Sequence, residues 1–196
     1  MEHELTAVEQ LAYSTVRIET DLTNGDVGTG TGFFYRFNEQ DDGTHVPVIV
    51  TNKHVVKDAI KGYFRLTLRD SAGAPDTKNH FTFQLNKFEK RWTPHPDGKT
   101  DLCAMPIAPL LNLAKEQNKE FFFVSLDKSL LPSQADYADM FGMDDITMVG
   151  YPNGIWDSVN NFPVMRKGIT ATNPKYDWNG KKEFLIDCAC FPGHLS

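Results

Sequence analysis

The chain begins with one stretch of helical periodicity and then changes to short runs in which apolar and polar residues alternate. Residues 5–13 place apolar side chains at helical spacing behind a capping pattern of Thr6 and Glu9, which predicts a short N-terminal helix. After residue 14, β-branched and aromatic residues recur with period two, as is typical of antiparallel strands. We expect strands at residues 14–20, 28–37, 48–50, 63–68, 81–85, 101–107, 121–126, 146–152, 164–172 and 184–187.

Turn signals and a few helical pieces separate these strands. Turns are expected at 24–26 and 41–43, loops at 73–79 and 94–98, and helical pieces within 54–60, 110–119 and 132–141. Many short strands and few helices predict an all-β architecture with two barrel-like halves. We expect an N-terminal helix at 1–14, a first barrel at 15–107, a linker at 108–120 and a second barrel at 121–196.

Composition narrows the classes of partner. With 196 residues, the chain suits one sizeable domain or two small packed halves. A net charge of −6 argues against a nucleic-acid partner, because phosphate binding needs a basic surface. No apolar run approaches the roughly 20 residues that span a membrane, so no membrane partner is expected.

The cysteines and the first residues point to a reducing compartment. Cys103, Cys188 and Cys190 are too few for a disulfide framework, and we expect buried free thiols. Cys188 and Cys190 make a poor metal motif because no second pair is spaced for zinc, so neither a metal nor a cofactor is expected. Residues 1–4 lack the apolar region of a secretory signal, and a cytoplasmic location is therefore expected.

One strand ends in a histidine that a rigid element can aim into a cleft. Residues 48–50 (VIV) are β-branched, residues 51–53 (TNK) mark the exit from the sheet, and His54 follows. An isolated histidine is more often a core or surface residue without a role. Residues 28–32 (GTGTG) lead into an aromatic strand rather than a helix, which favours backbone bending over phosphate binding.

The order of three residue types along the chain gives His54 a chemical context. His54 ends a strand in the first half, Asp101 opens a strand at the end of that half, and residues 191–196 (FPGHLS) stand near the C-terminus, with Leu195 at the template's serine spacing and Ser196 one residue later. A serine hydrolase needs a base for the hydroxyl proton, a carboxylate to orient the imidazole, and N–H groups for the oxyanion. The order and spacing match the chymotrypsin-type template. Alone, Asp101 could equally be a strand-capping carboxylate.

Six short segments carry a resemblance to a known family. They are residues 30–33 (GTGF), 51–56 (TNKHVV), 101–102 (DL), 149–152 (VGYP), 166–169 (RKGI) and 187–194 (DCACFPGH). On these segments the chain resembles the trypsin-like serine peptidases, closest to the bacterial branch of the high-temperature-requirement proteases. The resemblance implies two six-stranded-type antiparallel β-barrels and endopeptidase activity on a protein or peptide substrate.

The resemblance also implies roles for individual residues. His54 would be the general base and acid, and Asp101 would orient its ring. The backbone N–H groups of Gly193 and Leu195 would form the oxyanion hole. Ala189 would lie at the base of the specificity pocket, where its lack of charge favours small or apolar substrate side chains.

The chain departs from the family at the nucleophile. Leu195 occupies the family's serine position, and Ser196 comes one residue later, where a one-residue slip re-aims a side chain. The family's last strands are also missing, so the second barrel is expected to be incomplete. Either the chain is a truncated or frame-shifted product of a longer peptidase, which we favour, or it is a pseudo-peptidase that binds peptides. Little or no peptidase activity is expected, and a partner segment could complete the second barrel.

Overall fold

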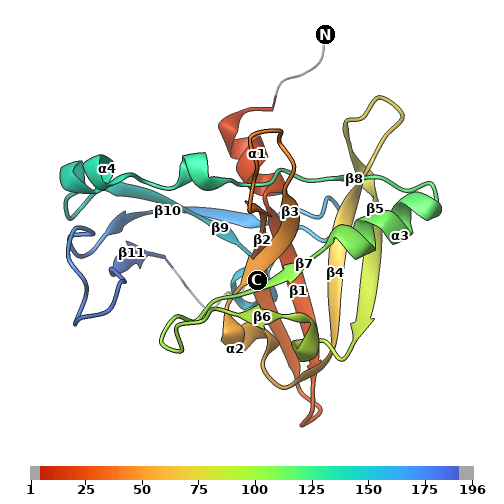
Figure 1. The fold of residues 1–196 in the computed structure, drawn as a ribbon, viewed down its shortest axis with the longest axis horizontal. Coiled ribbons are helices and arrows are strands. Elements are labelled where there is room, and N and C mark those ends of the chain that lie inside the picture. Colours follow the sequence, from red (N-terminus) through yellow and green to blue (C-terminus); the bar gives the residue numbers. More distant parts are fainter. Residues whose placement is uncertain (1–4, 190–196) are drawn as a thin grey trace.

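The computed structural model describes residues 5–189, which form two antiparallel β-sheets joined by short helices and turns (Figure 1). This mostly-β architecture confirms the predicted class. Within that range, the larger sheet contains β1 (Thr15–Leu22), β2 (Val27–Phe37), β3 (Val46–Thr51), β4 (Ala59–Arg69), β5 (Pro75–Asn86), β6 (Thr93–Pro94), β7 (Cys103–Pro106) and β8 (Phe121–Phe122). The smaller sheet contains β9 (Asp145–Gly150), β10 (Val164–Thr170) and β11 (Ile186–Cys188).

Short helices connect the strands, and some of them begin with a side-chain capping hydrogen bond. They are α1 (Ala7–Tyr13), α2 (Lys53–Val56), α3 (Ala108–Glu116) and α4 (Gln134–Asp139), with 3-10 turns η1 (Glu89–Arg91), η2 (Lys128–Leu130) and η3 (Pro152–Gly154). The predicted N-terminal helix is confirmed as α1, where the Thr6 hydroxyl accepts the N–H of Glu9 and the Glu9 carboxylate accepts the N–H of Thr6. Over residues 5–189, the structure has no helix with the length and apolar character required to cross a membrane.

Strand β1 lies inside the larger sheet, and every second side chain of its first half is buried in the core. It pairs with β2 on one edge and β4 on the other, in the order β5-β4-β1-β2-β3-β7-β6. Val16, Ile18 and Phe34 are fully buried, and burial of each such side chain contributes about 1.5–3 kcal/mol. In the described residues this strand order runs from β5 to β6 without closing on itself. Closure into a barrel therefore stays a prediction, as does the division into residues 15–107 and 121–196.

The expected loop at residues 73–79 is wrong in part, because β5 already begins at Pro75. The pairing with β4 shifts between Thr67 and Leu68: Thr67 faces His80, whereas Leu68 faces Asp76. This irregularity accommodates additional polar residues in β5, which the apolar alternation could not reveal.

The expected strand at residues 121–126 also differs, because its paired part is only β8 and it joins the larger sheet. β8 pairs with β4, and Phe121 packs against the rings of Phe81 and Phe83. Phe121 is buried with these rings in the hydrophobic core of the larger sheet. This explains why the segment pairs with the larger sheet and does not begin the smaller one. Further along, Leu126 bridges to Tyr35 of β2.

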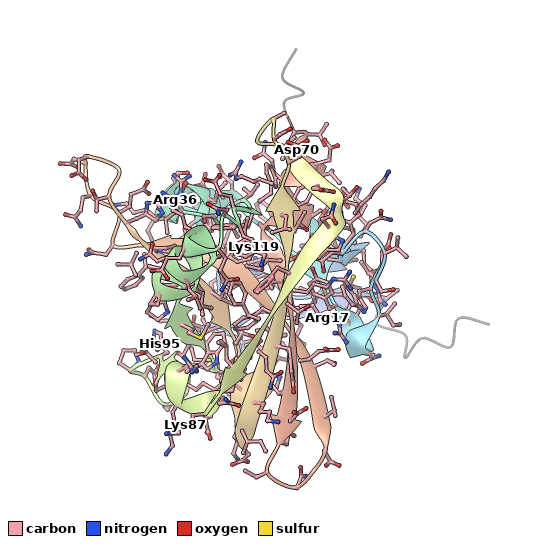
Figure 2. All side chains as sticks on the ribbon, turned by 90° about the vertical axis from the view of Figure 1, so that its right-hand side faces the viewer. Arg17, Arg36, Asp70, Lys87, His95 and Lys119 are labelled. Carbon is pink, nitrogen blue, oxygen red and sulfur yellow. The ribbon has the colours of Figure 1, made fainter. Side chains whose placement is uncertain are left out.

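The smaller sheet is held against the larger one through the connection between β9 and β10. Trp156 in this connection has the guanidinium carbons of Arg17 and Arg65 at 4.8 and 5.3 Å from its ring centroid. Figure 2 shows Arg17 beside the blue ribbon of the C-terminal part. Asn161 donates to the carbonyl oxygen of Arg65 at 3.1 Å. The two sheets therefore meet through specific polar and cation–π contacts.

Candidate active site

Helix α2 holds His54 immediately after the buried strand β3. Thr51 ends β3, Asn52 is the extended N-cap residue, and His54 is the second residue of a four-residue helix. The hydroxyl of Thr51 donates to the backbone carbonyl of Thr31 at 2.8 Å, which fixes the strand end. The side chain of His54 is 71% exposed, so its ring is accessible to a substrate.

Asp101 contacts the side chain and the backbone of His54 at the same time. Its Oδ2 lies 2.5 Å from Nδ1 of the ring, and its Oδ1 accepts the backbone N–H of His54 at 3.2 Å. The hydrogen bond from the His54 side chain lowers the pKa of Asp101 below its ordinary value. An ionised carboxylate only accepts hydrogen bonds, so Nδ1 carries the proton and Nε2 is left as the acceptor in the neutral ring. This is the tautomer that a general base needs.

The loop that carries Asp101 is tied to α2 by the two residues before His54. The side-chain amide of Asn52 donates to the backbone carbonyl of Asp101 at 2.8 Å. The ammonium group of Lys53 donates to the carbonyl of Asp97 at 3.3 Å. Asp101 itself lies two residues before β7 rather than at its start, so the sequence prediction was displaced by two positions.

A single threonine joins this part of the site to the smaller sheet. The Thr31 hydroxyl accepts the backbone N–H of Tyr151 at 2.9 Å, while its carbonyl accepts the hydroxyl of Thr51. A Cβ on Gly150 would lie 2.6 Å from that same Thr31 hydroxyl, so the close approach requires glycine. Thr31 thus links the end of β3, just before the helix that carries His54, to the end of β9.

The structure places only part of the predicted second half of the site. Ala189 follows β11 and is exposed, and its carbonyl oxygen accepts a hydrogen bond from Arg166 at 2.5 Å. Gly193, Leu195 and Ser196 lie outside the described residues. The structure therefore brings His54 and Asp101 together, while the predicted roles of Ala189, Gly193, Leu195 and Ser196 stay predictions.

The thiol closest in sequence to Asp101 is buried and poorly suited to act as a nucleophile. Cys103 is 4% exposed, and burial raises the pKa of its thiol to about 11, with a smaller contribution from the charge of Asp101. Cys188 is half-buried and free, whereas Cys190 lies outside the described residues. Residues 5–189 contain no cluster of three or more His, Cys, Asp or Glu side chains able to hold a metal ion.

One sizeable pocket in the described part of the chain lies away from His54. It measures about 1190 Å³ and is lined by α1 residues such as Val8 and Tyr13, by the turn between β4 and β5, and by Phe122 and Phe162. Figure 1 shows α1 and that turn at the top of the larger sheet, with α2 and β6 at the bottom. The candidate active site is instead an exposed histidine–aspartate pair on the surface.

Sequence reasoning assigned no supporting role to Asn52 or Thr31, although both lie in segments that carry the family resemblance. Asn52 lies two residues before His54 at a strand end, and its capping chemistry could have been noticed there. Thr31 could not be found, because its partners Thr51 and Tyr151 are distant in sequence.

No protein-family model matches the sequence, and no curated protein matches it at a significant level. Several solved structures, in contrast, resemble the structure of this chain. The HtrA-type protease AlgW, with a bound tripeptide, superposes with a TM-score of 0.51 at 14% identity over 92% of this chain. Deg5 superposes with a TM-score of 0.52 at 16% identity over 95% of this chain. The fold is the trypsin-like fold of the HtrA-type proteases. This confirms the structural resemblance inferred from the sequence segments.

The similarity to AlgW and Deg5 is a similarity of fold, and the share of each protein's own length that this chain covers differs between the two. This chain spans 44% of the AlgW chain and 77% of the Deg5 chain. At such low identity, activity and substrates have to be argued from the residues of this chain.

Proposed function

We propose that this chain carries the base-and-carboxylate half of a trypsin-like serine endopeptidase site. The observation that carries the proposal is the double contact of Asp101, with Oδ2 on the ring Nδ1 of His54 and Oδ1 on its backbone N–H. A carboxylate held at two points fixes both the tautomer and the direction of the ring. The HtrA-type fold supports this assignment, and in it the two sheets would correspond to the two barrels.

In this proposal the chemistry is acyl transfer to a hydroxyl. Nε2 of His54 accepts the hydroxyl proton as the oxygen attacks a peptide carbonyl, and then donates it to the leaving amine. Asp101 stabilises the imidazolium that forms in between. The N–H groups of Gly193 and Leu195 would bind the oxyanion, and Ala189 would form an uncharged pocket base that accepts small or apolar side chains.

The chain as it stands is proposed to hydrolyse peptides poorly or not at all. Leu195 has no hydroxyl, and Ser196 is displaced by one residue from the family position. Removing the nucleophile of a catalytic triad, as in subtilisin, lowers turnover by a factor on the order of 10⁶. His54 and Asp101 would then form a base and its orienting carboxylate without a correctly placed hydroxyl to deprotonate.

A second candidate function is peptide binding, which one feature of the smaller sheet favours. Among the described strands, β11 pairs only with β10, so its outer edge is open to an added strand. The exposed apolar side chains of Ile186 in β11 and of Phe184 and Leu185 just before it would contact such a strand. The occupant would be a partner segment or a peptide, and AlgW was solved with a tripeptide.

The proposed function is tested with a fluorophosphonate probe and a peptide-hydrolysis assay. The wild-type chain should be neither labelled nor active above His54→Ala. Leu195→Ser should become labelled, and the further change His54→Ala should abolish that labelling. His54-dependent hydrolysis by the wild type, lost in Ser196→Ala, would overturn the proposed inactivity. Absence of labelling in Leu195→Ser, or labelling that does not need His54, would overturn the assigned roles.

A further inference from the structure

Asn52 occupies a helix-capping position without capping the helix. It is the N-cap residue of α2 with φ −79° and ψ 145°, yet its side chain makes no cap hydrogen bond. N-cap asparagines normally accept an N–H from the first turn, which contributes about 1 kcal/mol. Here the amide of Asn52 turns away and donates to the backbone carbonyl of Asp101 at 2.8 Å.

The side chain of Asp101 supplies the cap that Asn52 does not. His54 is the second residue of α2, so its backbone N–H lacks a partner within the helix. Oδ1 of Asp101 accepts that N–H at 3.2 Å. Asn52 and Asp101, which are 49 positions apart, therefore make two reciprocal contacts. The side chain of Asn52 binds the backbone of Asp101, and the side chain of Asp101 caps the helix that Asn52 precedes.

We propose that Asn52 is a positioning residue, which sets the backbone of Asp101 so that its carboxylate reaches both N–H groups of His54. The inference rests on the proposed function for the catalytic meaning of the His54–Asp101 pair. Asp101 needs such a restraint because it lies in a loop and its side chain is 49% exposed. An unrestrained exposed carboxylate loses its hydrogen bonds to water, since ordering it costs conformational entropy.

The contact of Asn52 is suited to this restraint in a way that a cap bond is not. It acts on the main chain of Asp101, so it limits the loop without competing for the carboxylate oxygens. Lys53 restrains the same loop four residues earlier, through the carbonyl of Asp97. Together the two contacts orient the loop from both ends, with the shorter one next to the carboxylate.

The test is the variant Asn52→Ser in the full 196-residue chain. Serine caps helices as well as asparagine does and is uncharged, but it is too short to reach the carbonyl of Asp101. The matched control is Thr6→Ala, which removes the cap of α1 and leaves α2 untouched. For each chain the Asp101 carboxyl titration is followed by carbon NMR, the exchange rate of the His54 amide proton is measured, and thermal unfolding is recorded.

We expect Asn52→Ser to raise the titration midpoint of Asp101 towards that of an ordinary aspartate. The His54 amide should exchange about fivefold faster, the change that loss of one modest hydrogen bond produces. Thr6→Ala should lower the melting temperature without either change. The inference is overturned if Asp101 and the His54 amide are unaffected in Asn52→Ser, or if Thr6→Ala affects them equally. A wild-type chain whose Asp101 titrates as an ordinary aspartate, unaffected by His54→Ala, would instead contradict the proposed function.

Discussion

Gly30 in β2 lies directly against Val55, the residue that follows His54. A Cβ added to Gly30 would lie 2.5 and 2.6 Å from the two methyl carbons of Val55, closer than such atoms approach each other. The glycine in this strand therefore makes room for α2. The position of α2, and with it that of His54, therefore depends on the lack of a side chain at Gly30.

Gly30→Ala should displace α2 and weaken the contact between His54 and Asp101. Overpacking of this kind costs about 1–3 kcal/mol of unfolding free energy. Urea unfolding and the NMR signals of His54 would measure both effects. Gly142→Ala is the control, because nothing lies within 4 Å of a Cβ at that position. The double variant Gly30→Ala with Val55→Ala should recover part of the loss, and no recovery would argue against this steric account.

Thr31→Val should destabilise the junction between the two sheets. Valine matches threonine in shape but cannot accept the N–H of Tyr151, a residue that is 3% exposed. An unsatisfied buried N–H costs about 1–3 kcal/mol. Thr31→Ser retains the hydroxyl and serves as the control. If urea unfolding finds Thr31→Val at least as stable as Thr31→Ser, the Tyr151 hydrogen bond has no such role.

Acid should remove the stabilisation that the Asp101–His54 contact provides. The hydrogen bond from His54 lowers the pKa of Asp101 in the folded chain. Its contribution to unfolding free energy is therefore complete above about pH 4, the ordinary aspartate pKa, and is lost as the pH falls through the lower folded-state pKa. The stability difference between wild type and His54→Ala should shrink below about pH 4. A difference that stays constant with pH would disprove this linkage, and His45→Ala controls for histidine removal elsewhere.

Local signals made several elements predictable from the sequence. The Thr6–Glu9 capping pattern predicted α1, and the β-branched run at residues 48–50 predicted β3. The contact between His54 and Asp101 was predicted from the order of residue types and from the family resemblance, because no local sequence signal connects the two residues.

Long-range pairing explains what the sequence did not reveal. The start of β5 at Pro75 depends on an irregular register with β4, and β8 joins the larger sheet because Phe121 finds its aromatic neighbours there. The same holds for Asn52, whose local capping chemistry predicts a bond within α2. The contact with Asp101 prevails because the carboxylate can satisfy the helix instead.

The most direct test of the account is nitrogen NMR of the His54 ring in its neutral form. The contact with Asp101 predicts a proton on Nδ1 and a free lone pair on Nε2, which is the arrangement that can accept a hydroxyl proton. Asp101→Asn should shift the ring away from this tautomer. A wild-type ring protonated on Nε2, or a tautomer unchanged in Asp101→Asn, would contradict the assignment of His54 and Asp101 as a peptidase base and its orienting carboxylate.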